Sequence, residues 1–200
     1  MKSVKIVLLN IKYVAESKEK ILSYVDKGRA EKSARFIKEQ DGLLSLGGAY
    51  LIKKYVGDFF VDDKGKPRAQ SVFFNISHSH DLVGIALSDE CEIGFDVEYA
   101  RKEDGDVIAY CLSDEEMKAY KKGLPFLSMF VAKESLAKAD GRGIIGNVKK
   151  IPALPADGFV AYGGKNFYRH KVEADGYFAS VSLENKDFTF CTKILTEITF

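Results

Sequence analysis

The order of helix-forming and strand-forming segments constrains the fold of this chain most, because the same order occurs twice. Apolar periodicity predicts a first set of helices at residues 16–27, 29–39 and 43–56, the first two separated by Gly28. Strands are predicted at 4–11, 71–76, 82–88 and 91–98. Helices are then predicted again at 105–112, 113–122 and 126–139, and β-type segments dominate 158–200. This arrangement predicts an α+β (α/β) fold of two halves, 1–100 and 101–200.

A short internal similarity also suggests two halves. Residues 81–88 (DLVGIALS) align without gaps with residues 175–182 (DGYFASVS), and each follows a strand that opens on an aromatic residue, Phe74 or Phe167. If this reflects duplication, two related halves meet at a shared cleft, and such clefts often bind ligands. Identity at only the first and last of the aligned positions also arises by chance, so both explanations stay open.

Composition and charge exclude several classes of protein. The 200 residues include 30 basic and 29 acidic side chains, for a net charge of +1, so bulk attraction to nucleic acid is not expected. No apolar run is long enough to cross a bilayer, and the N-terminus reads as a strand rather than a signal peptide. Three cysteines without a C-x-x-C pair indicate a reducing compartment. We therefore expect a cytoplasmic monomer that binds neither nucleic acid nor membrane.

One local excess of charge stands out. Residues 27–54 hold seven basic and three acidic side chains, counted from the sequence. Such a patch can bind a small polyanion, although a solvated helix face is the more common outcome.

Two carboxylates fall on one face of a predicted strand. In Ile93–Glu98 (IGFDVE), the side chains of Asp96 and Glu98 point the same way, because successive residues of a strand alternate between faces. A hard cation such as Mg²⁺ relieves the repulsion between them and prefers such ligands. A polar sheet face in solvent gives the same pattern.

The helix at 126–139 carries a mixed stripe. Phe126, Phe130, Glu134 and Lys138 recur every fourth residue and share one face. An isolated Glu–Lys pair of this spacing is usually a surface ion pair worth about 0.3–0.5 kcal/mol. The two aromatic residues on the same face favour a packed interface instead.

The segment Phe74–Ser79 (FNISHS) joins a strand to a turn. Hydroxyl groups, backbone N–H groups and the imidazole of His78 could contact phosphate there. Asn75 and Ser77 could equally form a local turn.

Taken together and in order, these motifs resemble the 4′-phosphopantetheinyl transferases, in particular the Sfp-like, pseudo-dimeric class of about 200 residues. The motifs that carry the resemblance are G-K-P (65–67), F-N-I-S-H-S (74–79), I-G-F-D-V-E (93–98) and F-x-x-K-E-S-x-x-K-x-x-G (130–141). Residues 27–56 and 142–200 match only in layout. The resemblance implies two pseudo-symmetric α/β halves, each with a small, largely antiparallel sheet packed on helices, and an active site in the cleft between them.

The resemblance also implies a reaction. Such enzymes transfer the 4′-phosphopantetheine arm of coenzyme A to a serine of an apo carrier protein (acyl, peptidyl or aryl) and release 3′,5′-ADP. The metal is Mg²⁺, with Mn²⁺ as a substitute. Catalysis of this kind depends on a metal, cationic side chains and in-line positioning.

Individual roles follow residue by residue from the same resemblance. Asp96, Glu98 and Glu134 match the metal-binding carboxylates, with Glu134 also the expected base, directly or through water. Lys138 matches the lysine that stabilises the pyrophosphate. Coenzyme A phosphates are expected at positions matched by Arg29, Lys32, Lys66, Ser77 and His78. Lys133 lies about 100° around the helix from Glu134 and is not expected in the site.

Two departures leave an alternative open. Phe130 stands where the family often has tryptophan, and Ser45 stands near a position where many members have arginine. Ser45 cannot supply a positive charge, although Arg35 could substitute. A degenerate relative that binds coenzyme A or a carrier without turnover is therefore the alternative.

Carrier docking is expected through residues 108–130. Leu112, Met117, Leu124 and Phe126 could lie exposed beside three lysines, Lys118, Lys121 and Lys122. The alternative is that these apolar residues belong to the core.

Overall fold

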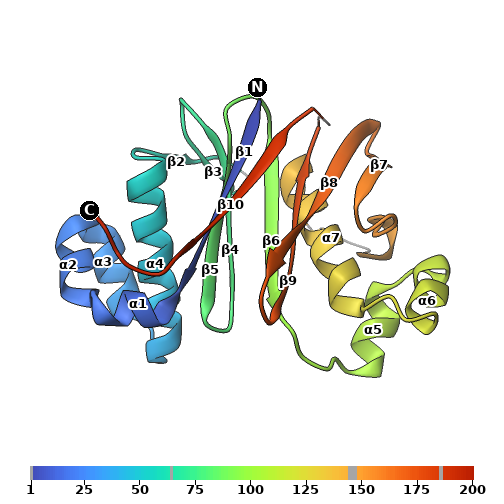
Figure 1. Cartoon of the computed structure of the whole chain (residues 1–200), viewed down its shortest axis with the longest axis horizontal. Coiled ribbons are helices and arrows are strands. Elements are labelled where there is room, and N and C mark those ends of the chain that lie inside the picture. The colour runs from blue at the N-terminus through green and yellow to red at the C-terminus, as the bar shows by residue number, and fades with distance from the viewer. Residues whose placement is uncertain (1, 64, 144–147, 185–186) are drawn as a thin grey trace.

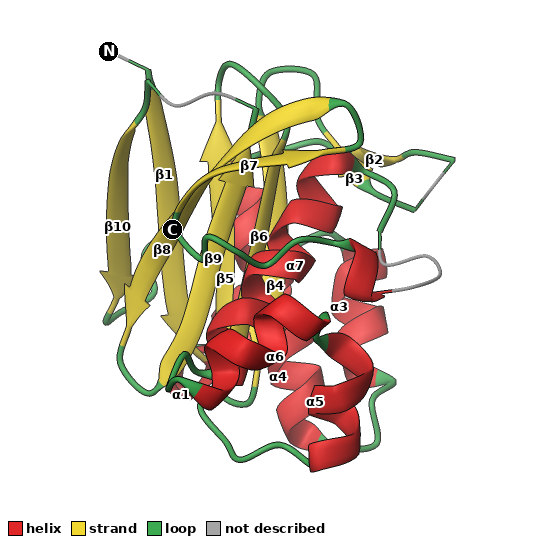
Figure 2. Cartoon of the chain, turned by 90° about the vertical axis from the view of Figure 1, so that its right-hand side faces the viewer, coloured by secondary structure: helices red, strands yellow, loops and turns green. Residues whose placement is uncertain are grey.

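Two sheets lie face to face between two groups of helices in the computed structural model, which describes residues 2–63, 65–143, 148–184 and 187–200 (Figure 1). One group comprises α1 (Ile11–Glu16), α2 (Lys18–Tyr24), α3 (Lys27–Ala34) and α4 (Glu39–Tyr55). The other comprises α5 (Gly105–Cys111), α6 (Asp114–Lys121) and α7 (Phe126–Asp140), followed by the 3₁₀ turn η1 (Val148–Lys150). Figure 2 turns this second group towards the viewer.

The first sheet has the order β10–β1–β5–β4, formed by Thr189–Leu195, Ser3–Asn10, Leu82–Ser88 and Phe73–Ser79. The second has the order β6–β9–β8–β7, formed by Ile93–Tyr99, Tyr177–Leu183, Lys165–Ala174 and Gly158–Tyr162. All ladders in these sheets are antiparallel except that between β1 and β10. The expected mixed α/β fold with small, largely antiparallel sheets packed on helices is confirmed.

Each sheet contains a strand from the opposite part of the chain. Strand β6 precedes residue 100 yet pairs with β9, whereas the late strand β10 pairs with β1. The aligned segments 81–88 and 175–182 fall largely on β5 and β9, each the second strand of a hairpin in the interior of its sheet. Pseudo-symmetry, and the division into halves at residue 100, stay predictions.

Apolar side chains fill three successive layers. Between the sheets, Ile6 and Leu8 of β1 pack with Phe95 and Val97 of β6. On the outer face of the first sheet, alternate residues such as Val7 and Leu9 pack against α4. The second sheet packs against α7 in the same way. Strands β1 and β5 are therefore apolar on both faces. Each fully buried aliphatic or aromatic side chain contributes about 1.5–3 kcal/mol, so both layers stabilise these strands.

The helix boundaries near the N-terminus differ from prediction. The break expected at Gly28 is wrong, because this glycine lies in the first turn of α3, where backbone N–H groups have no partner within the helix. The chain instead leaves the helical conformation at Val25, with φ −81° and ψ 162°. Residues 57–70, where no helix or strand is predicted, contain a small hairpin of β2 (Phe60–Val61) and β3 (Pro67–Arg68).

The apolar residues proposed for carrier docking belong to the core. Leu112 and Phe126 are buried, and Met117 and Leu124 are half-buried against the same cluster. The prediction that these side chains form an exposed docking face is therefore wrong. Their burial follows from the mutual packing of α5, α6 and α7, which needs an apolar interior. The three lysines of the segment remain exposed: Lys118, Lys121 and Lys122.

Among the described residues, no helix combines the length and the apolar character needed to span a bilayer.

Candidate active site

Strands β4 and β6 are the facing edges of the two sheets, and side chains of β4 join them. The amide oxygen Oδ1 of Asn75 accepts a hydrogen bond from the backbone N–H of Phe95 at 2.9 Å. At the other end, Ser79 Oγ accepts from the N–H of Tyr99 at 3.0 Å. The segment FNISHS therefore does not form a local turn at Asn75 and Ser77. Instead it binds the neighbouring sheet.

Asp96 lies at the centre of this junction. Its Oδ1 accepts hydrogen bonds from Ser77 Oγ at 2.8 Å and from Lys138 Nζ at 2.6 Å. The residue is only 4% exposed, so the alternative of a carboxylate face in solvent is wrong for Asp96. Its other oxygen, Oδ2, is buried and has no hydrogen-bond partner. An unpartnered buried carboxylate oxygen is costly and calls for a functional explanation.

Gly94 lets α7 approach β6 closely enough to bring Lys138 to Asp96. A Cβ atom at this position would lie less than 3.0 Å from Ser135 O and Ala139 N. Below Gly94, the hydroxyl of Ser135 lies 2.9 Å from that of Ser182 on β9. The backbone of α7 thus packs directly on the backbone of β6. The stripe of α7 that contains Glu134 and Lys138 faces the junction of β4 and β6.

The predicted stripe on α7 is therefore at a packed interface. The rings of Phe126 and Phe130 stack with centroids 5.7 Å apart. Lys138 forms its ion pair with Asp96, which excludes the simple surface pair with Glu134. Phe130 is half-buried in the cluster formed with α5, so phenylalanine fills this position by packing.

The three predicted carboxylates interact electrostatically. Burial, and then the charge of Asp96, raise the pKa of Glu134 above its ordinary value. Burial also raises the pKa of Asp96, and the nearby Lys138 ammonium only partly opposes it. Glu98 accepts hydrogen bonds from Ser79 Oγ at 2.9 Å and from Arg101 Nη1 at 2.8 Å.

A divalent cation fits the chemistry of this set, although the side chains do not yet converge on one point. Within the described ranges, no three His, Cys, Asp or Glu side chains are grouped closely enough to hold a metal ion. Asp96 Oδ2 nevertheless lacks a partner, and Glu134 carries an unfavourable neighbouring charge. A cation bound by both would relieve the orphaned oxygen and the repulsion together.

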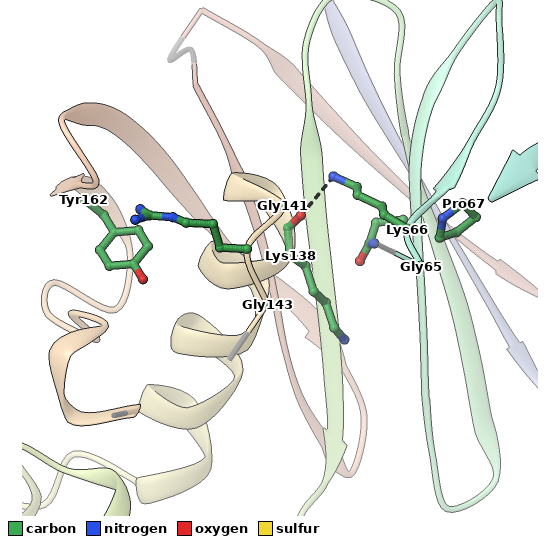
Figure 3. Close-up of a pocket in the computed structure, with 9 residues that line it drawn as sticks. Gly65, Lys66, Pro67, Lys138, Gly141, Gly143 and Tyr162 are labelled. Atoms are coloured by element: carbon green, nitrogen blue, oxygen red, sulfur yellow. Dashed lines mark hydrogen bonds between the residues drawn. The ribbon is translucent and has the colours of Figure 1, made fainter. Parts of the chain in front are cut away.

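Lys66 connects the β2–β3 hairpin to α7. Its Nζ lies 2.7 Å from Glu92 Oε2, 2.9 Å from the carbonyl oxygen of Lys138 and 3.5 Å from that of Ile93 (Figure 3). Burial lowers the pKa of this lysine to about 8. All three N–H groups of the ammonium thus have acceptors within the protein.

A cavity of about 790 Å³ opens beside these residues. The hairpin contributes Gly65, Lys66 and Pro67 to one wall, and Lys138 lies between the walls (Figure 3). The remaining lining residues are Asn75, Gly141, Arg142, Gly143 and Tyr162.

Of the predicted coenzyme A contacts, Lys66 and Lys138 line this cavity, whereas Ser77, His78, Arg29 and Lys32 are not among the described residues that line it. His78 is exposed and points to the face of β4 opposite to Ser77, the face on which Ile76 approaches α4. The guanidinium of Arg29 lies 4.5 Å above the ring of Phe59, and Lys32 is exposed on the same helix, α3. Their roles stay predictions.

Sequence reasoning missed four residues of the site. Asn75 carried a signal, since it lies two positions before Ser77 on one face of a strand, but it was interpreted only as a candidate turn residue. Arg101 also carried a signal, since it lies three residues after Glu98 and pairs with it. Arg142 and Tyr162 carried none, because nothing in the sequence relates these two residues to each other. Lys133 lies outside the site, as expected. It is fully buried and pairs with Glu116 at 2.7 Å.

The comparison with protein families agrees with this geometry. Residues 92–182 match the family model of the 4′-phosphopantetheinyl transferase superfamily. The matched stretch contains Asp96, Glu98, Glu134 and Lys138. A search of curated proteins returned no match to the chain. The family match supports a transferase and phosphopantetheine transfer in general.

Proposed function

We propose that this protein transfers the 4′-phosphopantetheine arm of coenzyme A to a serine hydroxyl of an apo carrier protein, in the manner of an Sfp-like enzyme with Mg²⁺ as cofactor. The observation that carries the proposal is the arrangement around Asp96, whose buried Oδ2 has no partner while Oδ1 binds Lys138. It lies within the stretch that matches the transferase superfamily.

The reaction balances as a single phosphoryl transfer. The serine oxygen forms a bond to the phosphorus that bears the pantetheine arm, and the bond from that phosphorus to the bridging oxygen breaks. The leaving group is 3′,5′-ADP, and the serine hydroxyl proton must be accepted by a base. Positioning and charge stabilisation dominate the rate of such transfers.

Asp96, Glu98 and Glu134 would hold the metal ion, which when bound would offset negative charge on the phosphate oxygens. To bind the metal, Glu98 would have to give up its hydrogen bonds from Ser79 and Arg101. Glu134 is also the proposed acceptor of the serine proton, directly or through water. Burial and the charge of Asp96 raise its pKa when no cation is bound, and a bound cation would oppose that rise.

Lys138 would stabilise the leaving oxygen. Its ammonium is already fixed by Asp96, by Ser77 Oγ at 3.2 Å and by the carbonyl oxygen of Phe95 at 3.3 Å. Because these bonds use all three of its N–H groups, Lys138 would act on the leaving oxygen through its charge rather than through a new hydrogen bond, and a fixed charge needs little reorganisation.

Mass spectrometry of a carrier tests the proposal. The purified protein is incubated with coenzyme A, Mg²⁺ and a panel of apo acyl, peptidyl and aryl carriers, and each carrier is weighed. Gain of one phosphopantetheine on at least one carrier is expected, with loss of the gain when Mg²⁺ is chelated. No gain on any carrier, together with tight coenzyme A binding, would favour the alternative of a binding protein without turnover.

A further inference from the structure

We propose that Arg142, supported by Tyr162, is an additional phosphate-binding group of the cavity and binds one of the phosphates of coenzyme A. The inference rests on the proposed function, since it assigns coenzyme A to this cavity. Neither residue belongs to the motifs 65–67, 74–79, 93–98 or 130–141 that carry the family resemblance.

The cavity has three basic side chains, and two of them have no donor left for a ligand. Lys66 directs its ammonium to Glu92 and to the carbonyl oxygens of Ile93 and Lys138. Lys138 directs its own ammonium to Asp96, Ser77 and the carbonyl oxygen of Phe95. Each lysine carries three N–H donors. Either lysine must therefore break an internal bond before it can bind a phosphate directly.

Arg142 differs from both lysines. Its Nε donates to Asp140 Oδ2, and the side chain is 51% exposed. In the described part of the chain, the Nη groups of this guanidinium have no hydrogen-bond partner. A guanidinium has five N–H donors, so the edge formed by Nη1 and Nη2 stays available for two parallel bonds to a phosphate.

Two features hold the guanidinium at the wall of the cavity. Its central carbon lies 4.8 Å from the centroid of the Tyr162 ring on β7, which fixes the plane of the group. Gly163 leaves the space that the group occupies, because a Cβ there would lie less than 3.0 Å from Nη2. Asp140 accepts the Nε–H hydrogen bond, so the Arg142 side chain would lose little further conformational entropy when it binds a ligand.

The cavity offers an anion a cationic N–H edge rather than an excess of positive charge. The described residues that line it comprise Lys66, Lys138 and Arg142 but no carboxylate. Each of these cations is paired with a carboxylate outside the lining, namely Glu92, Asp96 and Asp140. The Nη edge of Arg142, which has no partner among the described residues, is therefore the feature that favours a phosphate. Its volume of about 790 Å³ lies within the range of small-molecule sites. Arg142 follows Lys138 closely in the chain, so a ligand with more than one phosphate can reach both cations. Coenzyme A carries a pyrophosphate and a separate 3′-phosphate.

Calorimetric titration without a carrier tests this inference separately from catalysis. Coenzyme A, dephospho-coenzyme A and 3′,5′-ADP are each titrated into the wild type, Arg142→Gln and the control Lys171→Gln. The control removes one exposed positive charge from β8, away from the cavity. We expect Arg142→Gln to raise the Kd for coenzyme A about ten- to a hundredfold, as for the loss of hydrogen bonds to a charged group. The control should stay within about twofold of wild type.

The ligand series identifies the phosphate. If Arg142 binds the 3′-phosphate, the effect disappears with dephospho-coenzyme A, and if it binds the pyrophosphate, the effect persists with that ligand. Tyr162→Leu should reproduce part of the loss, since it frees the guanidinium. Equal affinity of Arg142→Gln and wild type for all three ligands would overturn this inference alone. A wild type that binds none of them would overturn the proposed function as well.

Discussion

The hydroxyl of Ser77 lies 2.8 Å from Asp96 Oδ1 and links the edge strands of the two sheets. The same carboxylate oxygen also accepts a hydrogen bond from the ammonium group of Lys138 on α7. Three elements that are distant in sequence thus converge on one atom, while the second oxygen of the carboxylate is left without a partner. The residue that joins the sheets is also the best candidate for the chemistry.

Asp96→Asn should abolish transfer without unfolding the protein. Asparagine keeps the shape and can still accept the Ser77 hydrogen bond, but it removes the negative charge that a metal needs. We expect a fall in rate of at least about 10²–10³-fold, as for the loss of one transition-state interaction. The mass of the carrier, measured with and without Mg²⁺, checks the loss of transfer. The melting temperature of the variant, measured in the same two conditions, checks that it stays folded.

The matched control is Asp89→Asn, at an exposed position. The wild type and the control should both melt at a higher temperature with Mg²⁺, because a ligand that binds only the folded state stabilises it. Full activity of Asp96→Asn would remove the metal assignment.

Gly94→Ala should disrupt the packing of α7. The added Cβ would overlap the helix backbone at Ser135 and Ala139, so α7 must move away from β6 and take Lys138 with it. We expect a loss of stability of about 1–3 kcal/mol and a larger proportional loss of activity. Gly105→Ala is the control, since nothing lies within 4 Å of a Cβ there. Denaturant unfolding of both variants tests this, and equal stabilities would contradict it.

Lys133→Met should destabilise the protein through its partner. Lys133 is fully buried and lies 2.7 Å from Glu116, which is itself 3% exposed. Removing the ammonium leaves a buried carboxylate without its counter-charge, at a cost of about 3–5 kcal/mol. The double variant Lys133→Met/Glu116→Gln should recover the part of this loss that comes from the unpaired charge. It should not recover all of it, because the two oxygens of Glu116 accept from the N–H groups of Ser113 and Ala153, and glutamine has one oxygen. Urea titrations measure both variants. If Lys133→Met were as stable as the double variant, Lys133 and Glu116 would have no coupling energy.

Lys66 should make stability depend on pH in a predictable direction. Burial lowers its pKa to about 8 in the folded protein, whereas an unfolded lysine keeps its ordinary value of 10.5. Between these values the unfolded state binds more protons, so this residue adds stability as pH rises through the window, by at most about 1.4 kcal/mol per pH unit. The unfolding free energy of the wild type minus that of Lys66→Met should therefore increase from pH 8 to pH 10. A constant difference would contradict the lowered pKa.

Local patterns predicted the elements well where one signal dominated. The helix predicted at 113–122 is present as α6, and Ser113 and Glu116 form a capping box at its start with both hydrogen bonds made. The alternation in 93–98 placed Asp96 and Glu98 on one face, because the face opposite is the apolar layer between the sheets. Gly28 misled the helix prediction, because glycine is tolerated in a first turn as readily as it ends a helix.

The sequence by itself determined the residue types and their local geometry: two carboxylates on one strand face, a glutamate and a lysine on one helical stripe, and a serine two residues after an asparagine. Tertiary structure decided how these groups meet. Gly94 sets the distance of α7 from β6, the edge strands bring Ser77 to Asp96, and the guanidinium of Arg142 lies over the ring of Tyr162 on β7. These contacts join segments that are not adjacent in the chain. They depend on how whole layers pack, which no local spacing encodes.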